Sequence, residues 1–292
     1  MVSVPVAPPT QVPASGAKVS WRPIAWFGAL LILCYAPILY RMAVQWATNE
    51  DMGHGFFVPV VAGFIAWQRR HILLATPRQP NGWGLFLVIF AALEATVATL
   101  GAELFTARLA FVIALFGVIL YLGGKAWVKA LLFPLFLLLF MIPIPAIIYA
   151  QLTLKLQMLA SELGEVLITW MNIPVLRNGN TLVLPSQTLD IAEACSGIRS
   201  LLSLAFLSLV YAYFTDKRIW MRWALLIATI PIAIGANGVR VALTGLLSEV
   251  NPKLASGIYH ESEGYIVFIV ALIALVIVHR LISLAAKRWK RA

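Results

Sequence analysis

Three side chains in the second half of this 292-residue chain could together carry out nucleophilic catalysis: the thiol of Cys195, the guanidinium of Arg240 and the imidazole of His260. A thiolate is a strong nucleophile, and unpaired backbone N–H groups at the start of a helix lower the pKa of a thiol. A histidine can take the thiol proton and return it to a leaving amine. An arginine is always charged and can hold an oxyanion or a scissile carbonyl.

Each of these residues also has an ordinary structural explanation. A cysteine at a membrane border is often inert or acylated, an arginine at a helix end often extends to water, and a loop histidine beside carboxylates is often solvated. Four supporting candidates share this ambiguity. Arg199 is either an ion-pair partner, with Glu193 as one option, or a support for the site; Asn237 could cap a helix end; His54 could hydrogen-bond its own loop.

The elements that must position these residues are membrane-spanning helices. The chain is 61% hydrophobic and 12% charged, with a mean hydropathy of +0.90, and several apolar runs reach the roughly 20 residues that a span needs. The formal net charge of +10 comes from scattered basic residues and not from one basic face, so we expect no nucleic-acid partner. The two cysteines indicate no disulfide framework.

Hydropathy therefore predicts an all-α, polytopic membrane helix bundle with about eight transmembrane helices. The predicted spans are 23–39, 55–67, 83–100, 105–122, 130–149, 198–214, 220–236 and 264–282. With this arrangement most basic residues fall on the side of the two termini, and most acidic residues fall on the other side. Because cytoplasmic loops carry the excess of Lys and Arg, we expect both termini in the cytoplasm.

The predicted organisation is one transmembrane domain, residues 21–286, between two short cytoplasmic tails. Residues 1–20 are rich in proline and small residues and are expected to be disordered. The apolar run after them is followed by no small-residue cleavage site, so we expect a retained helix and not a removed signal peptide. Residues 287–292 form a basic tail, and we expect no further C-terminal domain after them.

The longest external segment is predicted at residues 151–194. Within it, residues 151–170 mix leucines and charged residues, as in an interfacial amphipathic helix or an extension of the preceding span. The pair Asn178-Gly179 between two apolar runs predicts a small extracytoplasmic β-hairpin.

The predicted spans bring the three leading candidates to one membrane surface. Spans 198–214 and 220–236 are joined by a short cytoplasmic turn and should be antiparallel neighbours. Counted outward from that turn, Cys195 and Arg240 are each about 30 Å away at helical rise, and His260 shortly precedes the last span. Since no second His, Cys or carboxylate falls at ligand spacing with them, we expect no metal and no cofactor.

Three sequence motifs resemble the exosortase and archaeosortase family of membrane cysteine transpeptidases. Residues 193–200, EACSGIRS, resemble the family's cysteine motif, and residues 237–240, NGVR, and His260 with Gly264 continue the resemblance in order. Residues 51–59, DMGHGFFVP, resemble the family's N-terminal His-Gly segment. The resemblance extends over most of the chain, from the first external loop to the last span.

What this resemblance implies is a nucleophile at Cys195, an essential arginine at Arg240 and a general acid/base at His260. Family members recognise membrane-anchored protein substrates by a C-terminal sorting signal with three parts: a short motif, often Pro-Glu-Pro, a transmembrane helix and a basic cluster. Cleavage leaves a thioester on the cysteine, which an amine or hydroxyl of a glycan or lipid-linked acceptor resolves. The implied location is a bacterial inner membrane, with the site facing the periplasm.

The residues by themselves leave three other classes of protein open. A transporter or channel should carry charges inside the membrane, where we place only the acidic residue Glu94 deep in a span. A glycan-lipid transferase or polymerase would also use an external Arg and His, but without dependence on Cys195. A non-catalytic assembly scaffold would need none of the three side chains.

Overall fold

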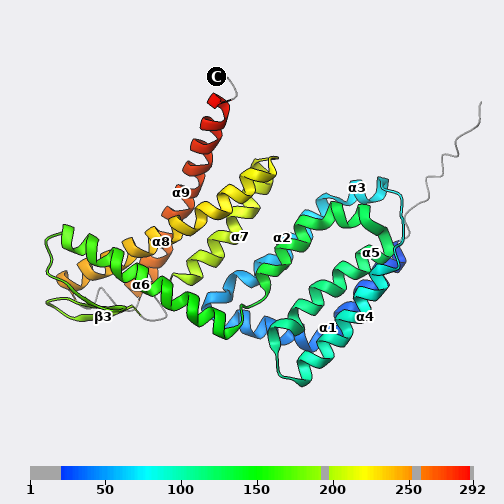
Figure 1. Cartoon of the computed structure of the whole chain (residues 1–292), viewed down its shortest axis with the longest axis horizontal. Helices are drawn as coiled ribbons and strands as arrows, with labels where there is room; N and C mark the ends of the chain where they lie inside the picture. The colour runs from blue at the N-terminus through cyan, green and yellow to red at the C-terminus, as the bar shows by residue number, and fades with distance from the viewer. Residues whose placement is uncertain (1–20, 192–196, 252–257, 290–292) are drawn as a thin grey trace, which may run out of the picture.

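The computed structural model describes residues 21–191, 197–251 and 258–289, and of residues 21, 258–262 and 289 only the helical backbone. Its α-helices are α1 (Trp21–Thr48), α2 (Phe57–Gln68), α3 (Arg70–Ala75), α4 (Trp83–Leu100), α5 (Leu104–Leu137), α6 (Ala146–Trp170), α7 (Ile198–Thr215), α8 (Ile219–Val250) and α9 (Ile258–Trp289). The shorter elements are the 3-10 helices η1 (Glu50–Phe56) and η2 (Leu138–Met141) and the strands β1 (Leu176–Asn178), β2 (Thr181–Val183) and β3 (Thr188–Asp190). Figure 1 shows how these elements are arranged.

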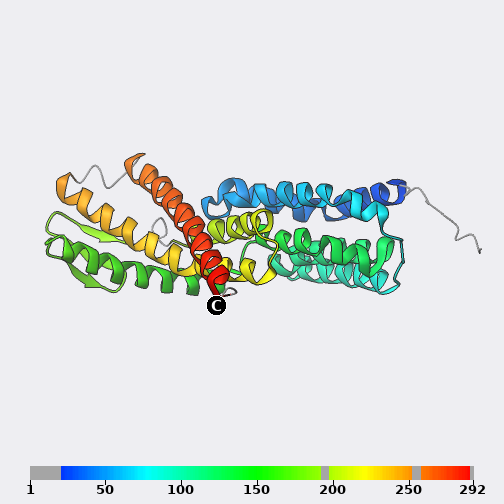
Figure 2. The same ribbon diagram turned by 90° about the horizontal axis from the view of Figure 1, so that it is seen from above.

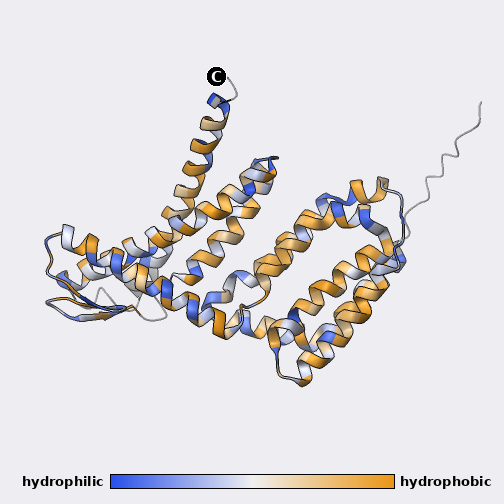
Figure 3. Ribbon diagram, in the orientation of Figure 1, coloured by the Kyte–Doolittle hydropathy of each residue, from blue (hydrophilic) through white to orange (hydrophobic). Residues whose placement is uncertain are grey.

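The described residues contain six helical segments that are long and apolar enough to cross a membrane. They correspond to α1, α4, α5 continued by η2, α7, α8 and α9. Hydrophobic residues cover most of their length in Figure 3, whereas α6 and the sheet carry a mixture of polar and apolar residues. The protein is therefore a multi-pass helical membrane bundle, as predicted.

Predicted and observed helices agree best at α4, which occupies the same residues, 83–100. The two predicted spans 105–122 and 130–149 correspond to α5, which bends at Gly124 in the left-handed region (φ 78°, ψ −170°). The second of these ends earlier than predicted, because proline lacks a backbone N–H and the segment containing Pro143 interrupts the helix. The second predicted span is α2, whose 12 residues fall short of about 20.

Helix α8 continues well beyond the predicted end of its span at Ala236 and reaches Val250. The added turns pack closely on α6: a Cβ atom on Gly164 would lie 2.5 Å from Cγ1 of Val241, and one on Gly238 would lie 2.6 Å from Cβ of Leu163. Hydropathy could not predict this extension, because packing of one helix against another stabilises polar turns that propensity alone does not.

Helix α6, the strands and the second half of α8 form a layer at one end of the molecule (Figure 1). β1 and β2 pair as the predicted antiparallel hairpin, and β3 adds a third antiparallel strand that was not predicted. α6 is a separate helix after Pro145 and not an extension of the preceding span. The core of this layer contains Ala160, Ile168, Leu182, Leu184, Ile191, Val241 and Ala242. Ile191, buried in that core, leads the chain toward residues 192–196.

Helix α7 joins the two halves of the bundle, which Figure 2 shows as an elongated arrangement with α1 to α5 at one end. Phe206 and Leu209 pack in the core shared with α1, α2 and α5. Leu204 and Ala212, on another face, pack with α8 and α9. The middle and second half of α7 are thereby packed on two faces, and this is the helix that follows the predicted cysteine motif.

Candidate active site

The predicted site residues fall partly outside the described residues. Cys195 and Glu193 lie in the segment 192–196, which the structure does not describe. His260 lies in the first turn of α9, so it belongs to the helix and not to the loop before it, and its side chain is outside the described part. The described residues close to them in the sequence therefore locate the site.

Gly197, two residues after Cys195, is the N-cap of α7 and has a left-handed backbone (φ 71°) that favours glycine. A Cβ atom on Gly197 would lie 2.8 Å from both Cγ and Nδ2 of Asn237, so this amide packs directly on the glycine backbone. Asn237 is buried inside α8. Asn237 therefore does not cap an end of its own helix, because α8 continues past it to Val250.

Arg240 lies one helical turn after Asn237 and faces the beginning of α9. A Cβ atom on Gly264 would lie 3.3 Å from Cζ and 3.4 Å from Nη2 of Arg240. The guanidinium of Arg240 therefore packs against this glycine. Gly264 comes four residues after His260 on the same helix. Adjacent turns of α8 thus contact the start of α7 and the first turns of α9.

A buried hydrogen bond joins α8 and α9 beside Arg240. The hydroxyl of Thr244 donates to Oε2 of Glu263 at 2.9 Å and lies 3.0 Å from the carbonyl oxygen of Arg240. The carboxyl group of Glu263 also interacts electrostatically with the Arg240 guanidinium. This contact fixes the height of α9 relative to α8 at the level of the site.

Arg199 forms ion pairs with η1, the short helix that follows α1. Its Nη2 lies 2.5 Å from Oε2 of Glu50, and its Nε lies 3.3 Å from Oδ1 of Asp51. The hydroxyl of Tyr149 in α6 donates to the other carboxylate oxygen of Asp51. The suggested partner Glu193 lies outside the described residues. Arg199 thus ties the first turn of α7 to η1 and, through Asp51, to α6.

His54 lies in η1 beside these carboxylates and is partly buried. Burial holds the pKa of the His54 imidazole below its usual value, and the backbone of Phe140 and of Asp51 acts in the opposite direction. A histidine with a lowered pKa is neutral at pH 7. In that form it can accept or donate a hydrogen bond without adding a charge beside Glu50 and Asp51.

Other parts of the described molecule offer no alternative centre of this kind. Within the described ranges, no three His, Cys, Asp or Glu side chains gather where they could hold a metal ion. A cavity of about 610 Å³ lies among α1, α2 and α5, but apolar side chains such as Leu31, Met42, Phe111 and Leu135 line it. This cavity carries no group for acyl transfer and does not include the site residues.

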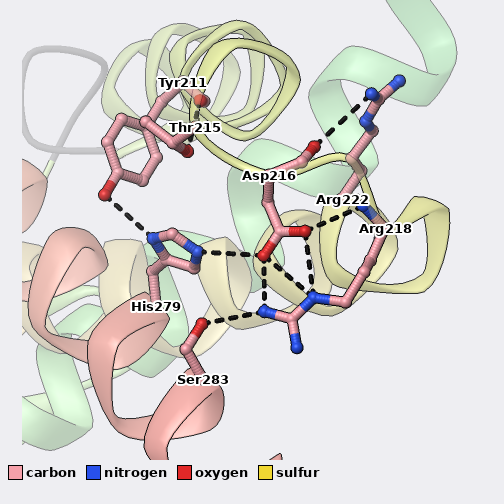
Figure 4. Close-up of polar contacts among 7 residues, drawn as sticks. All are labelled: Tyr211, Thr215, Asp216, Arg218, Arg222, His279 and Ser283. Atoms are coloured by element: carbon pink, nitrogen blue, oxygen red, sulfur yellow. Dashed lines mark hydrogen bonds and ion pairs between the residues drawn. The ribbon is translucent and has the colours of Figure 1, made fainter.

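Several polar contacts were not predicted from the sequence. Thr244 follows Arg240 by four residues, and Glu263 follows His260 by three. Residues at these spacings lie on one face of a helix, and this was the sequence signal that could have pointed to Thr244 and Glu263. No sequence signal links Tyr149 to Asp51. A second cluster that the sequence did not reveal surrounds Asp216 at the C-terminal end of α7 (Figure 4).

The sequence of the chain matches a protein-family model. The model described as transmembrane exosortase (Exosortase_EpsH) matches residues 46–277, a range that includes every candidate residue named above. Comparisons with curated proteins and with solved structures find no match. Since the matched range covers well over half of the chain, we conclude that this protein belongs to the transmembrane exosortase family.

Proposed function

We propose that this protein is a membrane-embedded cysteine endopeptidase and transpeptidase that removes a C-terminal sorting signal from membrane-anchored proteins. The observation that carries the proposal is the double contact of α8, through Asn237 with Gly197 and through Arg240 with Gly264. Two residues of chain reach about 7 Å at most, and one helical turn rises about 5.4 Å. These limits support a site in which Cys195, Arg240 and His260 act together.

In the first step, His260 takes the proton of the Cys195 thiol, and the thiolate attacks the scissile carbonyl carbon. Arg240 stabilises the negative charge on the carbonyl oxygen. The C–N bond then breaks, and His260 returns its proton to the leaving amine. The products are a free sorting-signal helix and a thioester between the substrate protein and Cys195.

In the second step, an amine or hydroxyl of a glycan or lipid-linked acceptor attacks the thioester carbon. His260 takes the proton of this nucleophile, the C–S bond breaks, and the thiolate leaves and recovers a proton. An amide or ester of the acceptor replaces the original peptide bond. No change of oxidation state occurs, so the reaction needs no redox partner.

We place this reaction at the periplasmic face of an inner membrane, with both termini in the cytoplasm. The excess of basic residues on the side of the termini supports this orientation. The layer formed by α6, the sheet and the second half of α8 would then cover the bundle on the periplasmic side (Figure 1). A substrate helix in the same bilayer would present its scissile bond near this layer.

Co-expression with a protein carrying a three-part sorting signal tests the proposal. Wild type should shorten the substrate and form a hydroxylamine-sensitive adduct at Cys195, both measured by intact-mass spectrometry, whereas Cys195→Ala should do neither. Cys34→Ala is the matched control, because Cys34 is exposed on α1 and should leave processing unchanged. Several signal motifs are tested in parallel, and wild-type processing by Cys195→Ala would refute the assignment.

A further inference from the structure

Two arginines, Arg41 and Arg108, line a small cavity between three membrane-spanning helices. The cavity has a volume of about 60 Å³ and lies among α1, the end of α4 and the beginning of α5. Apart from Thr99, the rest of its wall is apolar and consists of Pro37, Ile38, Leu104 and Ala107. The Thr99 hydroxyl donates to the carbonyl oxygen of Ala95 at 2.6 Å. The two guanidinium groups are therefore the side-chain donors that this wall offers to a ligand.

The cavity lies close to the ends of all three helices. α1 ends at Thr48, α4 ends at Leu100 and α5 begins at Leu104. Arg41 lies two turns before the end of α1, roughly 10 Å, and Arg108 lies one turn inside α5, roughly 6 Å. Because such helix ends lie at the surface of the hydrocarbon core, both guanidinium groups are within reach of lipid headgroups.

Arg108 carries a charge that the protein itself buries. The residue is 6% exposed, whereas Arg41 is exposed. An arginine that merely extends to water keeps its charged head exposed, and Arg108 does not fit that explanation. A buried charge is unfavourable unless hydrogen bonds or an opposite charge compensate it. Arg108 therefore needs a partner.

The described residues supply little of this compensation. None of them forms a hydrogen bond or an ion pair with Arg108 or Arg41. Glu103 attracts the charge of Arg108 from beyond ion-pair distance, and its carboxylate caps α5, accepting from the backbone N–H groups of Phe105 at 3.1 Å and Thr106 at 2.6 Å. The cavity thus has two positive charges and no carboxylate among the described residues of its wall, which predicts an anionic ligand.

The size of the cavity and its donors favour a phosphate group. A water molecule needs roughly 10–15 Å³ of such volume, so a cavity of about 60 Å³ takes a group of a few heavy atoms. The planar fork of an arginine binds two phosphate oxygens at once. Basic pockets between transmembrane helices bind phosphate-bearing headgroups. Ile38 and Leu104 beside the arginines suit a phosphate that is attached to a lipid.

We propose that Arg41 and Arg108 bind the phosphate group of an anionic membrane lipid at the membrane surface where α1 and α4 end. Arg108 is the buried anchor of this site, and Arg41 is the exposed second charge. The inference does not depend on the proposed function, because the cavity contains none of the candidate catalytic residues. Free phosphate has the same chemistry, and the experiment distinguishes the two sources.

Native mass spectrometry of the full chain, stripped of lipid in detergent, tests the proposal with phosphatidylglycerol as the probe. Arg108→Gln should weaken binding of the first lipid by at least about tenfold, because charge-assisted hydrogen bonds are lost. Arg41→Gln should weaken it by about fivefold. Arg280→Gln, which removes an exposed arginine of α9, is the matched control and should leave binding unchanged. Equal binding by wild type and Arg108→Gln overturns the proposal.

A second variant separates recognition of phosphate from a folding defect. Arg108→Lys keeps the buried charge but loses the planar fork, so it should fold as wild type does and bind phosphatidylglycerol about fivefold more weakly. The lipid should raise the thermal midpoint of wild type more than that of Arg108→Lys. Wild-type affinity together with a wild-type thermal shift in Arg108→Lys would contradict binding by the arginine fork.

Competition with inorganic phosphate identifies the source of the phosphate group. At millimolar concentration, inorganic phosphate should not displace phosphatidylglycerol, because it lacks the apolar contacts that an acyl chain makes beside the cavity. Displacement of the lipid by inorganic phosphate would overturn the assignment to a lipid.

Discussion

Two polar clusters connect α9 to neighbouring parts of the bundle, and they differ in whether both oxygens of their buried carboxyl group have a described hydrogen-bond partner. At the turn between α7 and α8, Asp216 binds Arg218 and His279 (Figure 4). In the second half of α8, Arg240 and Thr244 contact Glu263 on α9. Both clusters therefore combine a carboxyl group with an arginine. Each also involves a part of α9 that contains a histidine.

Both carboxylate oxygens of Asp216 have hydrogen-bond partners. Oδ1 of Asp216 accepts from the backbone N–H of Arg218 at 2.8 Å, and Oδ2 accepts from Nη2 of the same arginine at 2.5 Å. Hydrogen bonds from Arg218 hold the pKa of the Asp216 carboxyl well below its usual value. The ring of His279 lies between the Tyr211 hydroxyl at 2.9 Å and Asp216 at 3.4 Å, and Ser283 accepts from Arg218 at 3.0 Å.

The Glu263 cluster retains an acceptor, Oε1, without a partner in the described part of the chain. The ring of His279 contacts Tyr211 and Asp216, so this histidine links α9 to α7 and to the turn between α7 and α8. The comparison teaches that similar residue types on α9 can differ in packing: both oxygens of the Asp216 carboxyl group are paired, whereas one oxygen of the Glu263 carboxyl group has no partner among the described residues.

The largest effect should follow Arg240→Lys. Lysine retains the charge but not the planar fork of donors, so we expect processing to fall by about 1000-fold through loss of oxyanion stabilisation. The thermal midpoint in detergent should change little. Rates of substrate cleavage and unfolding curves for the same preparation check both statements. Near-normal cleavage by Arg240→Lys would contradict a catalytic role for the Glu263 cluster and leave it no different in function from the Asp216 cluster.

Asp216→Ala should lower stability and leave cleavage unchanged, which is the reverse of the effect expected for Arg240→Lys. Loss of the carboxylate leaves Arg218 and His279 without their partner, and we expect a loss of about 2 kcal/mol in stability, at the low end because the Arg218 side chain is 34% exposed. Cleavage per folded molecule should be unchanged. Unfolding in denaturing detergent measures the stability, with Lys217→Ala, an exposed residue of the same turn, as control. A defect confined to cleavage would show that this cluster has a catalytic role.

The stability that Asp216 contributes should depend on pH. Because the folded-state pKa of Asp216 is depressed, its contribution is complete above the unfolded pKa of about 3.9 and is lost as pH falls toward the folded value. The difference in thermal midpoint between wild type and Asp216→Asn should therefore be constant above about pH 5 and shrink below about pH 4. A difference that does not depend on pH would refute this account.

The smallest of these effects should come from Gly197→Ala. The left-handed conformation and the contact with Asn237 both oppose a Cβ atom there, and we expect cleavage to fall about tenfold as the start of α7 shifts. Gly179→Ala is the matched control, because Gly179 also has positive φ (65°) but has no atom within 4 Å of an added Cβ. Equal effects of the two variants would mean that backbone strain, and not the contact at the site, is responsible.

Local properties of the sequence determined much of this protein. Apolar runs of span length predicted the helical membrane bundle, and the boundaries of α4 follow directly from its run. The pair Asn178-Gly179 predicted the hairpin that β1 and β2 form. The motifs around Cys195, Arg240 and His260 indicated the family that the comparison with family models supports. These features depend on residues that are close together in the chain.

Only the tertiary structure decided where α8 ends and which polar groups pair. Asn237 lies inside a helix because α6 packs on the turns that follow it. Arg199 pairs with Glu50 and not with a neighbour in sequence that the structure describes, and Asp216 meets a histidine 63 residues away. Hydropathy and turn chemistry act within a few residues, whereas the choice of partner depends on how distant helices pack, and packing is a property of the whole chain.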